Sequence, residues 1–430
     1  MHAVSVRDPH EAIRAVFRTE SARLVAGLVR LVRDVGLAEE LAQDALVAAL
    51  EQWPTSGIPT APGAWLYVTA RRRALNALKR NALVARKHDQ LLPLEREREQ
   101  EHPDLEAKIE GEVGDDMLRL VLIACDPVLP IEGRIALTLR LLGGLSTAEI
   151  ARAFLLPEPT IAQRIVRAKR TLGETRPPFE VPRGAELARR LASVRDVVYL
   201  IFNEGYAATS GDDLMRLELC EDALRLGRML VQLVEEDAET HGLLALMELQ
   251  QSRAATRVDE AGDPVLLTNQ DRDRWDKALI AHGLAELERA ERLAESSGRY
   301  TLQASIAACH AGVRSAADTD WTRIVSLYGA LEALAPSPVV RLNRAVAVAM
   351  AQGPAAGLRA LDALSEEGSL RNYHLLPSAR AHLLEQLGRA EEARVEFERA
   401  AFLTENLRQR SRLLDRARAC TRGHQARGTR

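Results

Sequence analysis

The sequence predicts an all-α protein. Ala, Leu, Arg and Glu, which favour helices, dominate the chain, while aromatic residues make up only 4%. Apolar residues recur at helical spacing, and segments rich in β-branched or aromatic residues are scarce. Hydrophobic residues account for 47% of the 430 positions, which is enough to bury sizeable cores. The length indicates two to four domains.

Charge is unevenly distributed along the chain. The formal net charge of −3 argues against a protein that coats DNA through its overall charge. Basic residues outnumber acidic ones in 1–90 and 134–172, whereas acidic residues dominate 91–133. Local basic surface, rather than the global sum, determines phosphate contact, so two basic segments flanking an acidic one indicate two possible contacts with nucleic acid.

The cysteines and the N-terminus exclude several classes of protein. Cys125, Cys220, Cys309 and Cys420 stand apart from one another, so neither a disulfide framework nor a zinc site is expected, and no cofactor is predicted. The N-terminus lacks the apolar core of a signal peptide, and no apolar run reaches the ~18 residues of a membrane span. We therefore expect a soluble, cytoplasmic protein without a membrane partner.

The first basic element follows a long helical stretch. Residues 11–53 show helical periodicity, and the turn formers of 54–63 predict a loop. The next segment, AWLYVTARRRALNALKR, predicts a helix whose apolar side carries Trp65, Leu66, Val68, Leu75 and Leu78. Its polar side carries six basic or amide residues and no acid: Arg71, Arg72, Arg73, Asn76, Lys79 and Arg80. A solvated charged face is the alternative, but this face is more one-sided than solubility requires.

The second basic element, LSTAEIARAFLLPEPTIAQRIVRAKRTL (145–172), has the pattern of a helix-turn-helix. Ser146 and Glu149 form a capping box that begins a short helix at 147–154. Pro157 and Pro159 then interrupt the helix, and Pro159 suits the first turn of the next one.

The second helix of this pair has two distinct faces. Its apolar face carries Ile161, Ile165, Ala168 and Leu172. Its polar face carries Thr160, Gln163, Arg164 and Arg167, whose side chains are of the kinds that read base edges in a major groove. Lys169 and Arg170 extend the basic end toward phosphates. A solvated amphipathic helix pair is the alternative.

The long remainder of the chain is neutral and helical. The apolar run around 197–202 predicts a buried helix that Asn203, Glu204 and Gly205 terminate. Five residues of this region are candidates for a contact between domains: Tyr199, Phe202, Asn203, Glu204 and Tyr206. A packed helix with polar capping groups is the alternative.

A weak repeat lies toward the C-terminus. Gly353 and Gly388 are 35 residues apart, close to the period of tetratricopeptide helix pairs. The segment 374–407 matches such a pair well, 305–336 matches in its second helix, and the unit between them is weak. Arrays of this kind stack into a solenoid whose concave face binds a protein or peptide effector.

Together, these segments resemble a known family in order along the chain. AEELAQDALVAALEQW (38–53) and PGAWLYVTARRRALNALKR (62–80) resemble the second conserved region of bacterial extracytoplasmic-function (ECF) sigma factors, and 145–172 resembles their fourth region. YLIFNEGY, HGLLALMELQ, DRDRWDKALI and SPVVRLNRAVAVAMAQGPAAGL resemble the group of these factors that carries a long tetratricopeptide-like C-terminal extension.

The resemblance implies a factor that binds core RNA polymerase and promoter DNA. Glu40, Gln43 and Asp44 would contact the polymerase. The loop 54–63, Trp65 and the basic helix would engage the −10 element, and the polar face of 160–170 would engage the −35 element. The segment ARRRALNALKR departs from the RN-x-A-x-D pattern of many relatives, so −10 specificity does not carry over.

These observations predict five segments, each with its own role. They are 8–85 (sigma region 2), 86–115 (acidic linker), 116–174 (sigma region 4), 185–290 (first part of the C-terminal domain) and 291–420 (tetratricopeptide-like repeats). The linker is expected either to mimic nucleic acid in the polymerase channel or simply to be solvated. We expect the fused C-terminal domain to control activity.

Two other classes of function remain as alternatives. One is a helix-turn-helix operator-binding regulator attached to a tetratricopeptide-like interaction scaffold. The upstream basic helix argues against it, because an operator binder needs no module that melts DNA. The other is an enzyme within 185–290, but no phosphate-binding loop, metal cluster or nucleophile motif supports it, and we expect no enzymatic activity.

Overall fold

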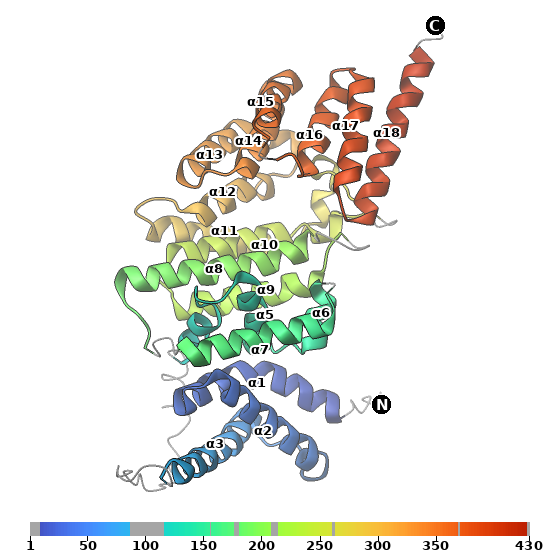
Figure 1. Ribbon diagram of the computed structural model, residues 1–430. Helices are drawn as coiled ribbons and strands as arrows, with labels where there is room; N and C mark the ends of the chain where they lie inside the picture. Colours follow the sequence, from blue (N-terminus) through green and yellow to red (C-terminus); the bar gives the residue numbers. More distant parts are fainter. Residues whose placement is uncertain are drawn as a thin grey trace, which may run out of the picture. The chain divides into compact units, whose positions relative to one another are not determined.

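The computed structural model describes residues 9–86, 116–154, 156–175, 180–207, 214–259, 263–368 and 370–427. These residues are predominantly helical, as predicted, and contain no strand beyond one isolated bridge between Val258 and Pro264. The chain divides into two compact units, 1–200 and 201–430. Figure 1 traces the helices of each unit. None of the described helices has the length and apolarity needed to span a membrane.

The first unit opens with three mutually contacting helices: α1 (Pro9–Val32), α2 (Val35–Ser56) and α3 (Pro62–Arg86). The predicted loop 54–63 is too long, because α2 continues through Pro54 to Ser56. A hydrogen bond from the Gly57 N–H to the Trp53 carbonyl, at 2.9 Å, closes this last turn. Residues 57–61 form the actual connection between α2 and α3.

The buried face of α3 differs from the predicted one at Val68. Leu66, Ala70 and Ala74, spaced four residues apart, are the buried positions, while Val68 is 58% exposed. Residues two positions apart in a helix are separated by about 200° around its axis, so Val68 cannot lie on the same face as Leu66. The prediction that placed Val68 on the apolar side was therefore wrong.

A second group of helices follows in the first unit. Residues 87–115, which include most of the predicted acidic linker, lie outside the described part of the chain. Residues 116–124 are helical, and α5 (Ile131–Leu141), α6 (Thr147–Phe154) and α7 (Glu158–Thr175) follow. The predicted start of α6 and the predicted interruption before α7 are both confirmed.

Helix α8 (Gly184–Tyr206) contains the apolar run that predicted a buried helix. Asn203, Glu204 and Gly205 do not terminate it, because the helix continues to Tyr206. Tertiary contacts hold this last turn: Glu204 pairs with Arg216 at 2.6 Å, and the Gly205 carbonyl accepts the Arg216 N–H at 2.6 Å. The division between the two units falls within α8, after Leu200.

The second unit is built around α10 (Ala238–Gln251), which is buried along its whole middle, from Thr240 to Leu249. It contacts α9 (Leu217–Leu233), α11 (Lys277–Leu293) and α12 (Arg299–Ala311). A helix buried on every side explains why residues 240–249 lack a clear polar face.

The rest of the second unit is a series of helices in which each contacts the next. They are α13 (Trp321–Leu334), α14 (Pro338–Gln352), α15 (Pro354–Glu367), α16 (Leu375–Gln386), α17 (Ala390–Leu403) and α18 (Leu407–Arg427). Gly353 and Gly388 make the turns between neighbours with φ of +94° and +75°, a backbone conformation that favours glycine. The segment expected to be a helix pair, 374–407, contains α16 and α17.

Candidate nucleic-acid interface

The start of α6 is fixed by the predicted capping box. The Ser146 N–H donates to Glu149 Oε2 at 2.7 Å, and the Glu149 N–H donates to Ser146 Oγ at 3.2 Å. These two bonds satisfy donors that would otherwise lack a partner at the end of the helix. Helix α6 also contacts α7.

Helix α7 presents the predicted polar face opposite its buried face. Ile161, Ile165, Ala168 and Leu172 are all buried. Gln163, Arg167 and Arg170 are exposed, and Thr160, Arg164 and Lys169 are partly exposed. Arg170 is paired with Glu174 at 2.7 Å, so its charge is partly compensated. The arrangement leaves amide, hydroxyl and guanidinium groups together on the accessible side of one helix.

A carboxylate of α2 occupies the basic end of α7. Glu39 forms ion pairs with Lys169 and with Arg140, the latter at 2.6 Å, and its side chain is only 9% exposed. Arg140 also donates to the Leu145 carbonyl at 3.1 Å. Glu39 and Arg140 were not predicted as site residues, because nothing in the sequence links two residues 101 positions apart.

The basic face of α3 is largely open to solvent. Arg71, Arg72, Asn76 and Lys79 are exposed. Arg73 is partly buried: its Nη1 lies 3.3 Å from Asp44 Oδ2 and donates to the Asp44 carbonyl at 2.9 Å. The side chain of Arg80 lies outside the described residues.

An aromatic pair anchors the start of α3. The ring centroids of Trp65 and Trp53 are 5.3 Å apart, and the two rings meet edge to face. Trp65 remains partly exposed. The edge-to-face contact fixes the start of the basic helix relative to α2.

The three candidate polymerase-contacting residues lie on α2. Glu40 and Asp44 are exposed, while Gln43 is partly buried and donates from Nε2 to Glu39 Oε1 at 2.8 Å. The opposite face of α2 is apolar and buried, so Glu40 and Asp44 lie on the accessible side.

The beginning of α8 is packed against the helix-turn-helix module, within the first unit. Arg190 pairs with Asp126 at 2.9 Å and donates to the Leu122 carbonyl at 3.2 Å. Ser193 donates from Oγ to the Cys125 carbonyl at 2.7 Å. The side chains of Arg190 and Asp126 are 10% and 9% exposed. The predicted boundary between the segments 116–174 and 185–290 gave no sign of this contact.

A second bond strengthens the same contact. Arg134 of α5 donates from Nη1 to Ser193 Oγ at 2.8 Å and from Nε to the Leu129 carbonyl at 2.9 Å. Burial raises the pKa of the neighbouring Cys125 thiol to about 11, so this sulfur stays protonated.

The five residues proposed as a contact between domains fall at the end of α8. Phe202 is fully buried and stacks on Tyr206 with ring centroids 5.5 Å apart. Glu204 is paired with Arg216, Asn203 is exposed and Tyr199 is partly buried. The aromatic pair and the Glu204 ion pair lie within the second unit, and a contact between domains stays a prediction.

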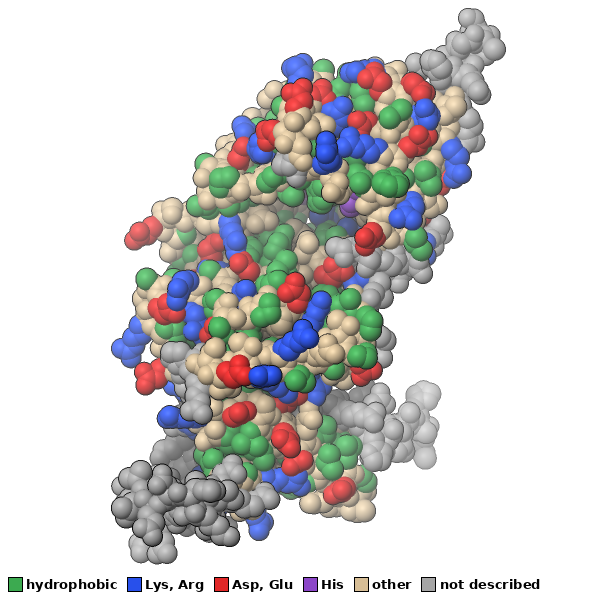
Figure 2. Space-filling view, viewed as in Figure 1, with side chains coloured by type: hydrophobic (Ala, Val, Ile, Leu, Met, Phe, Trp, Pro, Cys, Tyr) green, Lys and Arg blue, Asp and Glu red, His purple; other side chains and the backbone are tan. Residues whose placement is uncertain are grey.

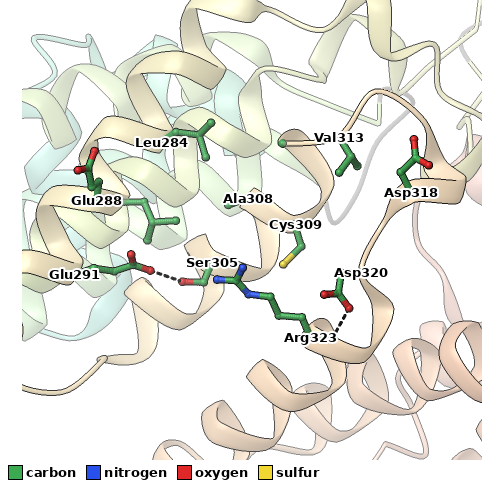
Figure 3. A pocket seen from close by; sticks show the side chains of 12 residues that line it. Leu284, Glu288, Glu291, Ser305, Ala308, Cys309, Val313, Asp318, Asp320 and Arg323 are labelled. Carbon is green, nitrogen blue, oxygen red and sulfur yellow. Dashed lines mark hydrogen bonds between the residues drawn. The ribbon is translucent and has the colours of Figure 1, made fainter.

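The second unit contains a cavity of about 390 Å³ among α11, α12 and α13 (Figure 3). Apolar side chains and Cys309 line it together with four carboxylates, Glu288, Glu291, Asp318 and Asp320. Arg323 is the one basic residue of the lining. This excess of negative charge suits a cation and disfavours the phosphates of DNA.

The surface of the second unit also differs from that of α3 and α7. Over α13 to α18, Figure 2 shows basic and acidic side chains interspersed, without a continuous basic patch on the face drawn. The described residues contain no group of three or more His, Cys, Asp or Glu that could hold a metal ion. The one-sided basic faces described above belong to the first unit.

Comparison with known proteins identifies three segments. Residues 16–83 match sigma-70 region 2, residues 121–172 match sigma-70 region 4, and residues 190–291 match a family of unknown function, DUF6596. An uncharacterized protein of Rhizobium meliloti (strain 1021) is 43% identical over 384 residues, which cover 89% of each chain. No solved structure matches. The two sigma regions coincide with the modules that carry the basic helices α3 and α7, and the chain therefore belongs to the ECF sigma factors that carry a C-terminal extension.

Proposed function

We propose that this RNA polymerase sigma factor divides promoter recognition between α7 and α3. Thr160, Gln163, Arg164 and Arg167 read the −35 element, and Lys169 and Arg170 contact its phosphates. Trp65 and the basic face of α3 engage the −10 element, while Glu40, Gln43 and Asp44 contact core polymerase. The observation that carries the proposal is the accessible polar face of α7 opposite four buried apolar residues.

A promoter library tests the −35 assignment. In run-off transcription with core polymerase, Arg164→Ala or Arg167→Ala should weaken promoter recognition by a free energy of ~1–3 kcal/mol. Each variant should also relax base selection at one position of the −35 element. Arg189→Ala, an exposed arginine on α8, is the matched control. If both α7 variants select the same promoters at the wild-type rate, α7 does not read the −35 element.

We also propose that the extension is required for initiation because its first helix completes the region 4 module. The support is the packing of α8 against the segment 122–126. A buried ion pair and a hydrogen bond hold Arg190 to this segment, and a second buried hydrogen bond holds Ser193. Removing one partner of a buried pair leaves an uncompensated charge and destabilises by about 3–5 kcal/mol. The DNA-reading helix α7 packs on the same module through α5.

A charge exchange tests this requirement in the full chain. Arg190→Glu should abolish run-off transcription, and the double exchange Arg190→Glu with Asp126→Arg should restore part of it. Arg189→Glu, one position away and exposed, should have little effect. Full activity of Arg190→Glu, with circular dichroism unchanged, would show that initiation does not depend on the docked α8.

The helix pairs of 291–420 are proposed to bind an effector protein or peptide. The acidic cavity of Figure 3 supports a basic segment as the bound group. Binding of a basic peptide to the full chain would support this proposal, provided that the variants Asp318→Asn and Glu288→Gln lose the binding.

A further inference from the structure

Three arginines meet where α10 ends. Arg253 and Arg257 flank the short helix η1 (Ala254–Thr256), and Arg272 opens another short helix, η3 (Arg272–Arg274). Helices η1 and η3 contact each other. The fold thus brings arginines from two separate loops into one neighbourhood of the second unit.

Two hydrogen bonds fix these loops together. The Asp276 N–H donates to the Ser252 carbonyl at 2.7 Å, and the indole N–H of Trp275 donates to Thr256 Oγ1 at 3.0 Å. Ser252, Thr256 and Trp275 are all buried. The arginines therefore project from a rigid base, which lowers the entropy lost when they bind a ligand.

Two of the guanidinium groups lie over the same aromatic ring. Arg257 Cζ is 3.7 Å from the ring centroid of Tyr206, and Arg253 Cζ is 5.6 Å from it. Arg257 also donates to the Tyr206 carbonyl. The ring attracts both cations but neutralises neither.

Arg272 is held by neutral acceptors. It donates from Nη1 to the carbonyls of His310 and Val313 at 2.5 and 3.1 Å, and from Nη2 to Thr319 Oγ1 at 3.2 Å. Burial lowers the pKa of Arg272, the charge of Arg253 adds to this effect, and Asp318 opposes it. Arg253 also helps to lower the pKa of Arg257, after burial.

None of these three arginines forms an ion pair with a carboxylate in the described part of the chain, in contrast to Arg190, which is buried, and Arg216, which is partly buried. Arg272 is buried, and Arg253 and Arg257 are partly buried. Cations removed from water are normally paired, so three such arginines without a carboxylate in ion-pair contact favour an anion. Three buried polar atoms beside them also lack a hydrogen-bond partner: Tyr206 Oη, Arg272 Nε and His310 Nδ1. Tyr206 is only 6% exposed.

We propose that Arg253, Arg257 and the hydroxyl of Tyr206 bind the phosphoryl group of a small molecule, with Arg272 adding its positive charge. A phosphoryl group has several acceptor oxygens, and the guanidinium fork matches two of them at once. The guanidinium of Arg253 forms no hydrogen bond within the described part of the chain, so it supplies the main contact.

Calorimetric titration of the full chain tests the site without any transcription assay. Inorganic phosphate, pyrophosphate and ATP are titrated separately, with acetate as the carboxylate comparison. Saturable binding of at least one phosphate compound, tighter than acetate, is expected. The three arms distinguish free phosphate from a phosphorylated metabolite.

Three variants locate the binding. Arg253→Gln should weaken the phosphate compound at least about tenfold, because a charge-assisted hydrogen bond is lost. Tyr206→Phe keeps the ring and should weaken binding by a smaller factor. Arg274→Gln, an exposed arginine two positions from Arg272, should bind like the wild type.

Arg253→Lys keeps the charge without the fork, and provides a second test if the glutamine variant fails to fold. It should bind more weakly than the wild type. The proposal is overturned if no phosphate compound binds at millimolar concentration, if acetate binds equally well, or if the folded Arg253 variants bind like Arg274→Gln.

Discussion

At the scale of single residues, Gly205 lies where α8 leaves no space for a side chain. A Cβ at this position would lie 2.8 Å from the Cys220 nitrogen and 2.9 Å from the Arg216 carbonyl oxygen. Both neighbours are backbone, which cannot swing aside as a side chain does. Gly205 therefore permits the close approach of α8 to the segment that begins α9.

Gly205→Ala should destabilise the protein by about 1–3 kcal/mol, because the backbone must shift to admit the methyl group. Gly329→Ala is the control: it lies inside α13 with no atom near its Cβ position, and alanine there should stabilise by about 0.5–1 kcal/mol. Urea unfolding of both variants measures the two changes. Equal stability of Gly205→Ala and the wild type would contradict the close packing.

At the scale of elements, α2 and α7 meet through the carboxylate of Glu39. Because Glu39 pairs with Lys169 and Arg140, part of the positive charge beside the polar face of α7, which we propose reads the −35 element, is compensated inside the protein. A Lys169 that contacts phosphate must therefore exchange one anionic partner for another.

Glu39→Gln should strengthen binding to promoter DNA, since it releases Lys169 for a phosphate. The slope of log affinity against log salt should steepen by about 0.9 for the added contact. Glu40→Gln, on the exposed side of α2, should leave the slope unchanged. Fluorescence anisotropy at several salt concentrations measures it, and identical slopes for Glu39→Gln and the wild type would rule out the exchange.

The helices that the sequence predicted best are those with local signals. The Ser146 capping box, the interruption at Pro157 and the apolar spacing of 161, 165, 168 and 172 are all present in the structure. Each depends on residues within one or two helical turns, so spacing alone reveals it.

Contacts between distant segments were not predicted. Arg190 meets Asp126, and Arg140 meets Glu39, only because the tertiary fold brings them together, and an isolated charge in the sequence does not indicate its partner. The same limit explains the error at Val68, because the tertiary fold decides which face of α3 is buried. The promoter-contact residues remain predictions of role, although their exposure is known.

At the scale of the whole molecule, two partly buried histidines of the second unit, His310 and His382, make the protein sensitive to acid. Burial, followed by the charges of Arg253 and Arg272, lowers the pKa of His310 to about 4. Burial and the charge of Arg416 lower the pKa of His382 to about 4. Both imidazoles are therefore neutral in the folded protein near neutral pH.

Stability should fall as the pH drops from about 6.5 to about 4, because the unfolded chain takes up these protons and the folded chain does not. Each histidine contributes a slope of about 1.4 kcal/mol per pH unit in this window. Urea unfolding of the full chain at several pH values measures the slope. The double variant His310→Gln with His382→Gln should be flatter, and an unchanged slope would contradict the assignment.

The cavity of Figure 3 also determines how the protein can be labelled. Cys125, Cys220 and Cys420 are buried, whereas Cys309, in the lining of that cavity, is partly exposed. A small maleimide should therefore attach a fluorophore to Cys309 first, although burial raises the pKa of this thiol and slows the reaction. The native sequence thus offers one reporter position beside the acidic cavity, and the dye would register a bound ligand there without any engineered cysteine.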